Sequence, residues 1–265
     1  LKKRTMLNYK NQSKQKTMRK LILSALLVAA TSSLFAQKLE DIQNQIGKKN
    51  YSDAKVKVDA ALNDPKNQSN SDFWFAKAQV YNNLAKTNQD TTLQAEALAA
   101  IQKYFELESS KEESKRAVKS ALEGHQTAFD IYSNYFKTGV SAFQAQNWQQ
   151  AYNNFSKSLT AFDLLTNNKL TNVTVDTTAV LYGGYSAQNA KLTDQAAQHY
   201  AQLADIKIAD TSYMGIYEYL VGYYQEKKDQ ANAQKYIDLS KSLFPNNPNW
   251  TAYELQGLDG DKSKK

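Results

Sequence analysis

A short pattern of small and aromatic side chains recurs along this chain at helical spacing. Its clearest copy has Gly139 on a first segment, followed by Trp148, Ala151 and Phe155 on a second. Side chains three or four residues apart lie on one face of an α-helix, so each segment carries one continuous stripe. Gly139 and Ala151 are small where two such stripes would meet. The pattern predicts two antiparallel helices packed together between about residues 134 and 163.

Four further copies of the pattern start near residues 42, 74, 180 and 217. The alanines that anchor the second helix of each copy are Ala54, Ala97, Ala151, Ala196 and Ala233. Only 3 Pro and 9 Gly occur in 265 residues. This scarcity of helix breakers favours helix along the chain. The sequence therefore predicts an all-α fold of about five helix pairs, with a helical bundle lacking repeat order as the alternative.

This pattern resembles the tetratricopeptide repeat, whose signature is W-x2-L-G-x2-Y, then A-x3-F, then P, over 34 residues. The residues that carry the resemblance are Gly139, Trp148, Ala151 and Phe155 in one copy and Ala233, Ile237 and Pro245 in another. The copies here are longer than 34 residues, so insertions or longer helices separate them. The resemblance implies a right-handed α-solenoid over residues 37–258. A short C-terminal capping helix that contains Trp250 would close the last pair.

The first 36 residues have the composition of an export signal. Met18 is followed by two basic residues, an apolar stretch runs from Leu21 to Phe35, and Ala36 is a small residue at a plausible cleavage point. These are the parts of a signal peptide. The apolar stretch is shorter than the roughly 20 residues of a membrane-spanning helix, so we expect cleavage in preference to an uncleaved anchor. Residues 1–17 are polar and basic, and we expect Met18 to be the true start.

The leader also indicates where the protein acts. Together with Gln37, it resembles the leaders of exported Bacteroidetes proteins. We therefore expect a periplasmic, extracellular or outer-envelope location, with no transmembrane segment after signal cleavage. The predicted organisation is an N-terminal extension and signal peptide over residues 1–36, the repeat domain, and a charged tail over residues 259–265.

Charge and composition exclude several classes of function. Eight of the 33 Lys and Arg residues lie in residues 1–36, which contain no Asp or Glu, so the remainder is close to neutral despite a net charge of +7. Nucleic-acid binding requires clustered basic residues on the folded part, and we expect none. The chain has no Cys, which excludes disulfides, thiolate catalysis and cysteine zinc sites.

No residue set predicts catalysis. The two histidines, His125 and His199, have no second ligand at metal spacing. His199 precedes Tyr200 and should lie beside the buried stripe, near the surface. Gly183 and Gly184 lack the strand and the Lys of a phosphate loop, so they indicate close helix packing. We predict no catalytic residue, no cofactor and no metal site, and therefore a protein that is not an enzyme.

The resemblance places a concave groove on the first helix of each pair. That face mixes aromatic and amide side chains with little charge, which suits an extended peptide. The candidate groove residues are Phe75, Gln79, Asn82, Asn83, Phe136, Val140, Phe143, Gln144, Leu181, Tyr185, Gln188, Asn189, Gln225 and Glu226. For each of them the alternative is packing against the neighbouring pair. The face lacks the paired Lys and Arg that clamp a C-terminal carboxylate in some tetratricopeptide proteins, so a co-chaperone role is not favoured.

The predicted function is a non-enzymatic protein–protein interaction scaffold of the bacterial cell envelope. Its partner would be a protein or peptide that the sequence does not identify. The alternative is a glycan or small-ligand binding protein of the envelope. In that case the stacking platforms would be Trp74, Phe136, Phe143 and Tyr185.

Overall fold

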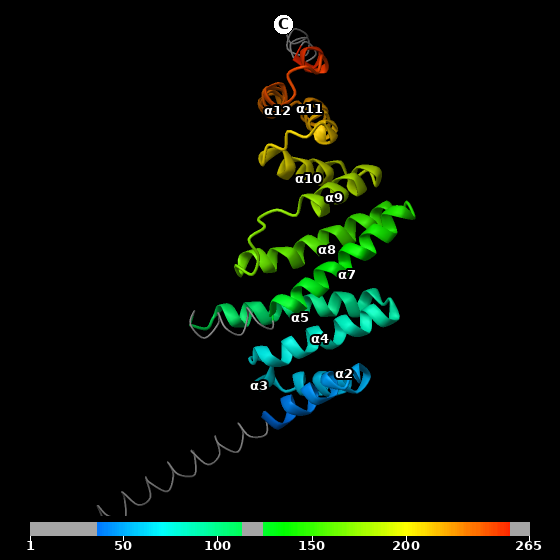
Figure 1. Ribbon diagram of the computed structural model, residues 1–265, viewed down its shortest axis with the longest axis vertical. Helices are drawn as coiled ribbons and strands as arrows, with labels where there is room; N and C mark the ends of the chain where they lie inside the picture. Colours follow the sequence, from blue (N-terminus) through cyan, green and yellow to red (C-terminus); the bar gives the residue numbers. More distant parts are fainter. Residues whose placement is uncertain (1–35, 113–123, 255–265) are drawn as a thin grey trace, which may run out of the picture. The chain divides into compact units, whose positions relative to one another are not determined.

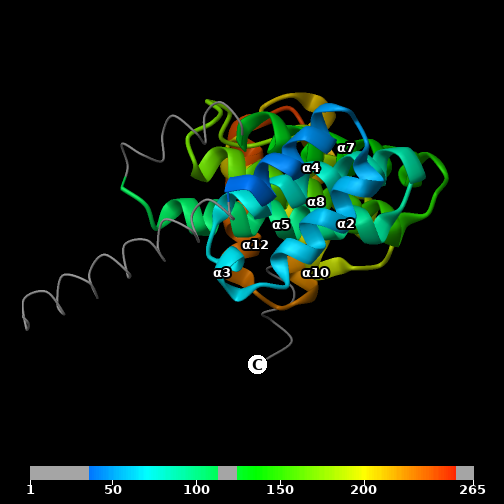
Figure 2. The same ribbon diagram turned by 90° about the horizontal axis from the view of Figure 1, so that it is seen from below.

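The computed structural model describes residues 36–112 and 124–254, and its chain divides into two compact units, Leu1–Lys119 and Ser120–Lys265. Within these described residues every regular element is helical and no strand occurs. Consecutive helices of each unit pack against one another (Figure 1), and Figure 2 shows the same helices from below. The predicted all-α class is confirmed. Residues 1–35 of the predicted leader, residues 255–258 and the predicted tail lie outside the described residues.

The first unit contains one helical segment over residues 36–47 and four labelled helices. These are α2 (Tyr51–Leu62), α3 (Pro65–Gln68), α4 (Ser71–Asn88) and α5 (Thr91–Ser109). Helix α4 contacts α2, α3 and α5, and so it is enclosed on several sides. Asp90 caps α5 by accepting hydrogen bonds from the backbone N–H groups of Thr92 and Leu93, at 2.8 and 3.1 Å. Only Gln89 and Asp90 separate α4 from α5, so the two helices form a tight pair.

The second unit contains three helix pairs. They are α7 (His125–Gln144) with α8 (Trp148–Asn167), α9 (Thr177–Asn189) with α10 (Thr193–Asp205), and α11 (Met214–Glu226) with α12 (Gln230–Leu243). A short 3-10 helix, η2 (Thr211–Tyr213), precedes α11, and residues 249–254 are again helical. Each α-helix from α7 to α12 packs against the next one along the chain. This nearest-neighbour order is that of an α-solenoid.

Glycines set the closest approaches between these helices. A Cβ placed on Gly184 would lie 2.5 Å from Cε1 of Tyr200, and one on Gly139 would lie 3.1 Å from the Phe155 ring. Real Cβ atoms essentially never come as near as 2.5 Å, so Gly184 cannot be replaced without moving the Tyr200 ring, and the 3.1 Å contact at Gly139 is tighter than most real Cβ contacts. The predicted close helix packing at these positions is confirmed.

The same turn joins first to second helices in both units. Lys49, Gln146, Lys191 and Lys228 all have φ near +60°, with values of 58, 59, 61 and 59°. In each turn the N–H of the following residue returns to a carbonyl five positions earlier, as from Asn147 to Ala142 at 2.9 Å. This is the Schellman arrangement that closes a helix C-terminus. Its recurrence supports the repeat reading independently of the side chains.

A final helical segment covers the last pair. Trp250 is only 1% exposed, and its indole N–H donates to the backbone carbonyl of Phe244 at 3.0 Å. Phe244 lies directly after α12, and Pro245, which follows it, cannot continue the helix. Trp250 belongs to the same hydrophobic core as Tyr217 and Leu220 of α11. The predicted capping segment is thus present over residues 249–254.

Candidate functional site

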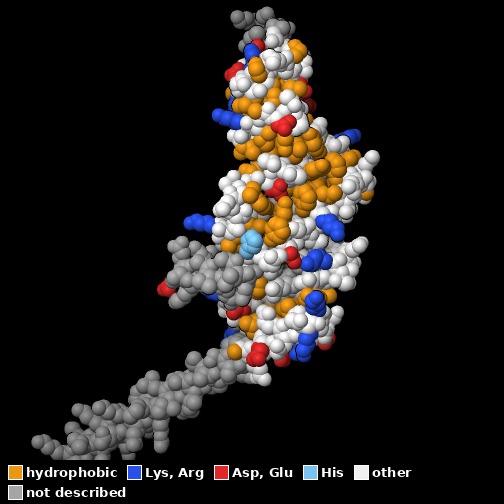
Figure 3. All heavy atoms as spheres, in the orientation of Figure 1, with side chains coloured by type: hydrophobic (Ala, Val, Ile, Leu, Met, Phe, Trp, Pro, Cys, Tyr) orange, Lys and Arg blue, Asp and Glu red, His pale blue; other side chains and the backbone are white. Residues whose placement is uncertain are grey.

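Helix α7 presents a half-exposed apolar stripe in the second unit. Phe136, Val140 and Phe143 are spaced by four and three residues, so they lie on one face of the helix. They pack with Tyr182 of α9 against a small core around Phe155. We name these four residues, Phe136, Val140, Phe143 and Tyr182, the aromatic patch. Figure 3 shows hydrophobic side chains gathered over the helices of this unit.

Ring contacts hold the aromatic patch together. The Phe155 ring of α8 lies edge-on to Phe136, with centroids 5.6 Å apart, and stacks on Tyr182 at 5.7 Å. Phe143 meets Tyr182 edge-to-face at 5.1 Å, across the boundary between two helix pairs. Such arrangements are favourable for aromatic rings. The aromatic patch is therefore a fixed surface, with its platform built from α7, α8 and α9.

The predicted amide candidates at the ends of α7 and α9 are exposed. Gln144 at the end of α7 and both Gln188 and Asn189 at the end of α9 face solvent. Gln188 accepts a hydrogen bond from the Tyr200 hydroxyl at 2.6 Å, which leaves its NH2 group for another acceptor. The Asn189 amide donates to the Tyr185 carbonyl at 2.8 Å and keeps its side-chain oxygen. These groups suit the backbone of a bound polypeptide.

The predicted groove residues of the first unit are buried or half-buried. Phe75 and Asn82 are 4% and 1% exposed, so both were wrongly assigned to a surface groove. The physical reason is that α4 is enclosed by α2, α3 and α5. Gln79 and Asn83 are half-buried, and the Asn83 amide donates to the Gln79 backbone carbonyl at 2.8 Å. The aromatic patch belongs to the second unit and includes none of these four.

The remaining candidates lie on α9 and α11. Leu181 and Tyr185 are half-buried and pack against the core cluster around Tyr200, so the alternative of packing between helices applies to both. Gln225 donates from its amide to the Tyr253 carbonyl at 3.0 Å, and Glu226 is exposed. These residues are not members of the aromatic patch.

Sequence reasoning missed Tyr182. It follows Leu181, which was chosen instead, and both side chains are half-buried. The signal was available, because Tyr182 lies next to the tightly packed Gly183 and three residues before Tyr185. A residue flanking a glycine in the helix contact is directed to the edge of that contact, where the Tyr182 ring meets Phe143.

His199 is more buried than predicted. Only 8% of it is exposed, and its ring lies beside Gly183, where an added Cβ would come within 2.9 Å of Cε1. The Tyr152 ring packs edge-on against it at 5.8 Å. Burial lowers the pKa of His199 to about 4, because the charged form is poorly solvated there. Within the described residues its buried Nδ1 has no hydrogen-bond partner.

One polar cluster in the first unit combines a hydroxyl, a carboxylate and an amine. The Ser71 hydroxyl donates to Glu108, and Lys111 contacts both, with its Nζ 2.9 Å from Ser71 Oγ. Ser71 is fully buried and Glu108 is 1% exposed, so a substrate does not reach them. The cluster instead ties the start of α4 to the end of α5. Among residues 36–112 and 124–254 no group of three His, Asp or Glu residues is placed to hold a metal ion.

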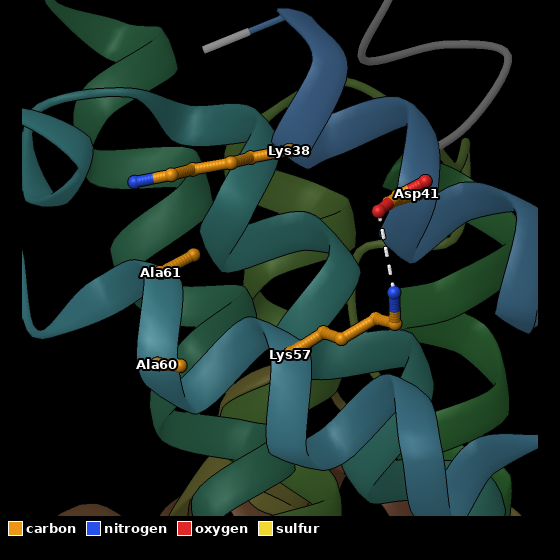
Figure 4. Close-up of a pocket in the computed structure, with 5 residues that line it drawn as sticks. All are labelled: Lys38, Asp41, Lys57, Ala60 and Ala61. Carbon is orange, nitrogen blue, oxygen red and sulfur yellow. Dashed lines mark hydrogen bonds and ion pairs between the residues drawn. The ribbon is translucent and has the colours of Figure 1, made fainter. Parts of the chain in front are cut away.

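A small surface pocket lies between the helical segment 36–47 and α2 in the first unit (Figure 4). It has a volume of about 220 Å³, and an ion pair between Asp41 and Lys57 at 3.2 Å crosses its wall. In Figure 4 Lys38 extends away from this pair. The residues that line this pocket include no aromatic ring and no side-chain amide, so beyond one exposed ion pair it offers nothing that would orient a ligand.

Comparisons with known proteins add little. No family model matches the chain, and no curated protein matches it. Among solved structures, the chain resembles the Cut9–Hcn1 hetero-tetramer of APC/C at 14% identity and a TM-score of 0.34, covering 83% of this chain and 42% of that one. The chain thus spans less than half of that protein.

Two further solved structures resemble the chain. PilF of Pseudomonas aeruginosa has 18% identity and a TM-score of 0.33, covering 83% of this chain and 96% of that one. YrrB, described as a TPR protein with an unusual peptide-binding site, has 14% identity and a TM-score of 0.28, covering 85% and 90%. These scores are too low to carry an argument about family or function. The α-solenoid assignment rests on the helix pairs, the repeated turns and the glycine contacts of this chain.

In the described part of the chain no helix combines the length and apolar character needed to span a membrane.

Proposed function

We propose that this protein is a non-enzymatic scaffold that binds a polypeptide partner through the aromatic patch of its second unit. The observation that carries the proposal is the half-exposed set Phe136, Val140, Phe143 and Tyr182, held rigid by Phe155. Cores of protein interfaces are rich in aromatic residues and poor in charge. The patch has this composition, and the exposed amide of Gln144, which directly follows Phe143, adds hydrogen-bonding groups.

The architecture supports the same proposal. A solenoid offers an extended surface made from several elements, which suits recognition of a chain better than chemistry on a small substrate. We further propose that the partner belongs to the bacterial cell envelope. Support for the location comes from the basic and apolar leader over residues 18–36.

The four aromatic residues predicted to stack on a glycan do not belong to one cluster. Phe136 and Phe143 pack around Phe155, whereas Tyr185 packs around Tyr200 in another cluster. Trp74 belongs to the other unit, and its indole N–H already donates to the Gln68 carbonyl at 2.8 Å. Glycan binding by this set of four is therefore not proposed.

Site-specific crosslinking tests the proposal. A photo-reactive amino acid at Val140 should give a crosslink to one partner when the mature protein is expressed in its host, because that position lies within the patch. The matched control is Val173, which is 54% exposed in the same unit but lies in the α8–α9 loop. The partner band should appear from Val140 and be absent from Val173.

A charge substitution completes the test. Val140→Lys should lower the affinity for the crosslinked partner at least tenfold, because a charge would be buried in an apolar contact. Val173→Lys should leave the affinity unchanged. The proposal would be wrong if the two lysine variants bound the partner equally, or if both photo-reactive positions captured the same proteins.

A further inference from the structure

A second surface feature of this unit lies between α10 and the end of α11. It is a groove of about 520 Å³, within the size range of small-molecule sites. Ala197 and Ala201 form its floor, and Asp194 and Asp205 stand at its two ends. Asp194 and Asp205 are eleven positions apart, which corresponds to about 16 Å along the helix axis. The aromatic patch has no residue in this groove, so the two surfaces are distinct.

Each end of the groove carries one neutralised ion pair. Asp194 contacts Lys227, the residue directly after α11, at 2.9 Å, and Asp205 contacts Lys235 of α12 at 3.2 Å. All four side chains are 50 to 59% exposed, so a ligand can reach them. At each end a carboxylate acceptor and an ammonium donor thus stand side by side with no net charge between them.

The first of these pairs is further ordered by Tyr223. Its hydroxyl donates to Oδ1 of Asp194 at 2.8 Å, the same oxygen that Lys227 contacts. This leaves Oδ2 to accept a hydrogen bond from a ligand. The Lys227 hydrogen bond, followed by that of Tyr223, lowers the pKa of Asp194 below its ordinary value, so the carboxylate is ionised at neutral pH.

Aromatic rings and amides line the middle of the groove. Tyr224 stacks nearly parallel on Tyr236 of α12, with an interplanar angle of 13° and centroids 5.5 Å apart, which fixes its orientation. Tyr223 meets Tyr224 edge-to-face at 5.0 Å. The exposed amides of Gln198 and Gln202 follow the same face of α10. The groove therefore offers ring surface beside groups that both donate and accept hydrogen bonds.

We propose that this groove binds a short neutral oligosaccharide. A vicinal diol matches each ion pair, since one hydroxyl donates to the carboxylate while its neighbour accepts from the ammonium. The apolar C–H groups of a pyranose ring gain by covering the carbon atoms of Tyr223 and Tyr224 that line the groove, and the alanine floor leaves room for them. An acidic sugar would be repelled by Asp194 and Asp205. Lys227 and Lys235 would attract it only weakly, because each is already paired with one of these carboxylates.

Alanine methyl NMR of the full mature chain tests this inference. The probes are maltotriose, cellotriose and triacetylchitotriose at millimolar concentration. At least one of them should shift the methyl signals of Ala197 and Ala201, while the signal of Ala54, buried in the first unit, stays in place. If none of the three shifts Ala197 or Ala201, the inference is wrong. A peptide that shifts both methyls where every trisaccharide fails would show a polypeptide groove and would also overturn it.

Two leucine substitutions provide a matched comparison. Ala201→Leu fills the floor with a strong helix former and should lower the affinity for the active trisaccharide at least tenfold. Ala231→Leu makes the same change at an exposed position in the first turn of α12 and should bind as the parent does. Equal binding by both variants would refute the site. Because Val140 is unchanged in these proteins, the crosslinking result at the aromatic patch is read separately.

Discussion

At the scale of single residues, two consecutive glycines of α9 lie against two consecutive side-chain rings of α10. Gly183 faces His199 and Gly184 faces Tyr200. The sequence predicted that this glycine pair serves helix packing, because it lacked every other part of a phosphate loop. It did not reveal the burial of His199, since Tyr200 alone was assigned to the buried stripe. Two consecutive glycines opposite two consecutive rings were the sequence signal that both rings are buried.

The Gly184 contact gives the first prediction. Gly184→Ala should lower the free energy of unfolding by about 1 to 3 kcal/mol, because its Cβ would overlap the Tyr200 ring and force it to move. Gly222→Ala is the control, since nothing lies within 4 Å of a Cβ there and α11 is helical. It should raise stability by about 0.5 to 1 kcal/mol. Urea unfolding followed by circular dichroism measures both, and equal effects would contradict the packing argument.

His199 gives a prediction about pH. Its pKa is about 4 in the folded chain against 6.5 for the unfolded residue, so protons bind preferentially to the unfolded state. The stability due to neutral His199 is complete above pH 6.5 and is lost progressively as the pH falls towards 4. The loss should approach about 3 kcal/mol at the lower limit.

The measurement compares the parent with His199→Leu over the same pH range. The unfolding free energy of the parent minus that of His199→Leu should fall steadily as the pH is lowered from 6.5 to 4. Titration of the carboxylates is common to both proteins and cancels in this difference. A difference that does not change with pH in this window would show that His199 is accessible to protons in the folded state.

At the scale of elements, the sequence predicted the helix pairs of the second unit well. The segments 134–163, 180–208 and 217–245 fall on α7–α8, α9–α10 and α11–α12. Periodicity succeeds here because each helix has one buried stripe, which repeats every three to four residues. It fails for Phe75 and Asn82 because α4 is enclosed by three neighbours, and a helix buried on several sides has no single exposed face to identify.

The capping segment gives a prediction at this scale. Trp250→Ala should remove hydrogen-exchange protection from α11 and α12, because the core around Tyr217 and Leu220 would lose its cover. Helix α7, which packs in the separate cluster around Phe155, should keep its protection. Mass spectrometry of deuterium uptake resolves the two regions.

A control and a contrary outcome define that test. Val173→Ala changes a half-exposed side chain of the same unit and should alter neither region. If Trp250→Ala raised exchange in α7 as much as in α12, the unit would unfold as one block and the nearest-neighbour description would be wrong.

At the scale of the whole molecule, the candidate site was predicted only in part. Phe136, Val140 and Phe143 were found because they share one stripe of α7. Tyr182 was missed because its place depends on how α9 packs on its neighbours, which no local pattern records. The α10–α11 groove lay beyond sequence reasoning for the same reason, since Asp194, Tyr223 and Lys227 meet only after α10 and α11 have packed.

The recurring turn has a consequence for how such a chain can change. Each Schellman joint is completed by main-chain bonds within its own few residues, as at Lys191 and Leu192, and needs no distant side chain. A helix pair together with its joint is therefore a module whose turn is built locally, while its apolar faces are buried only against the neighbouring pairs. Genetic duplication or loss of one module would leave every other joint intact, so the length of the array can evolve while its local geometry stays the same.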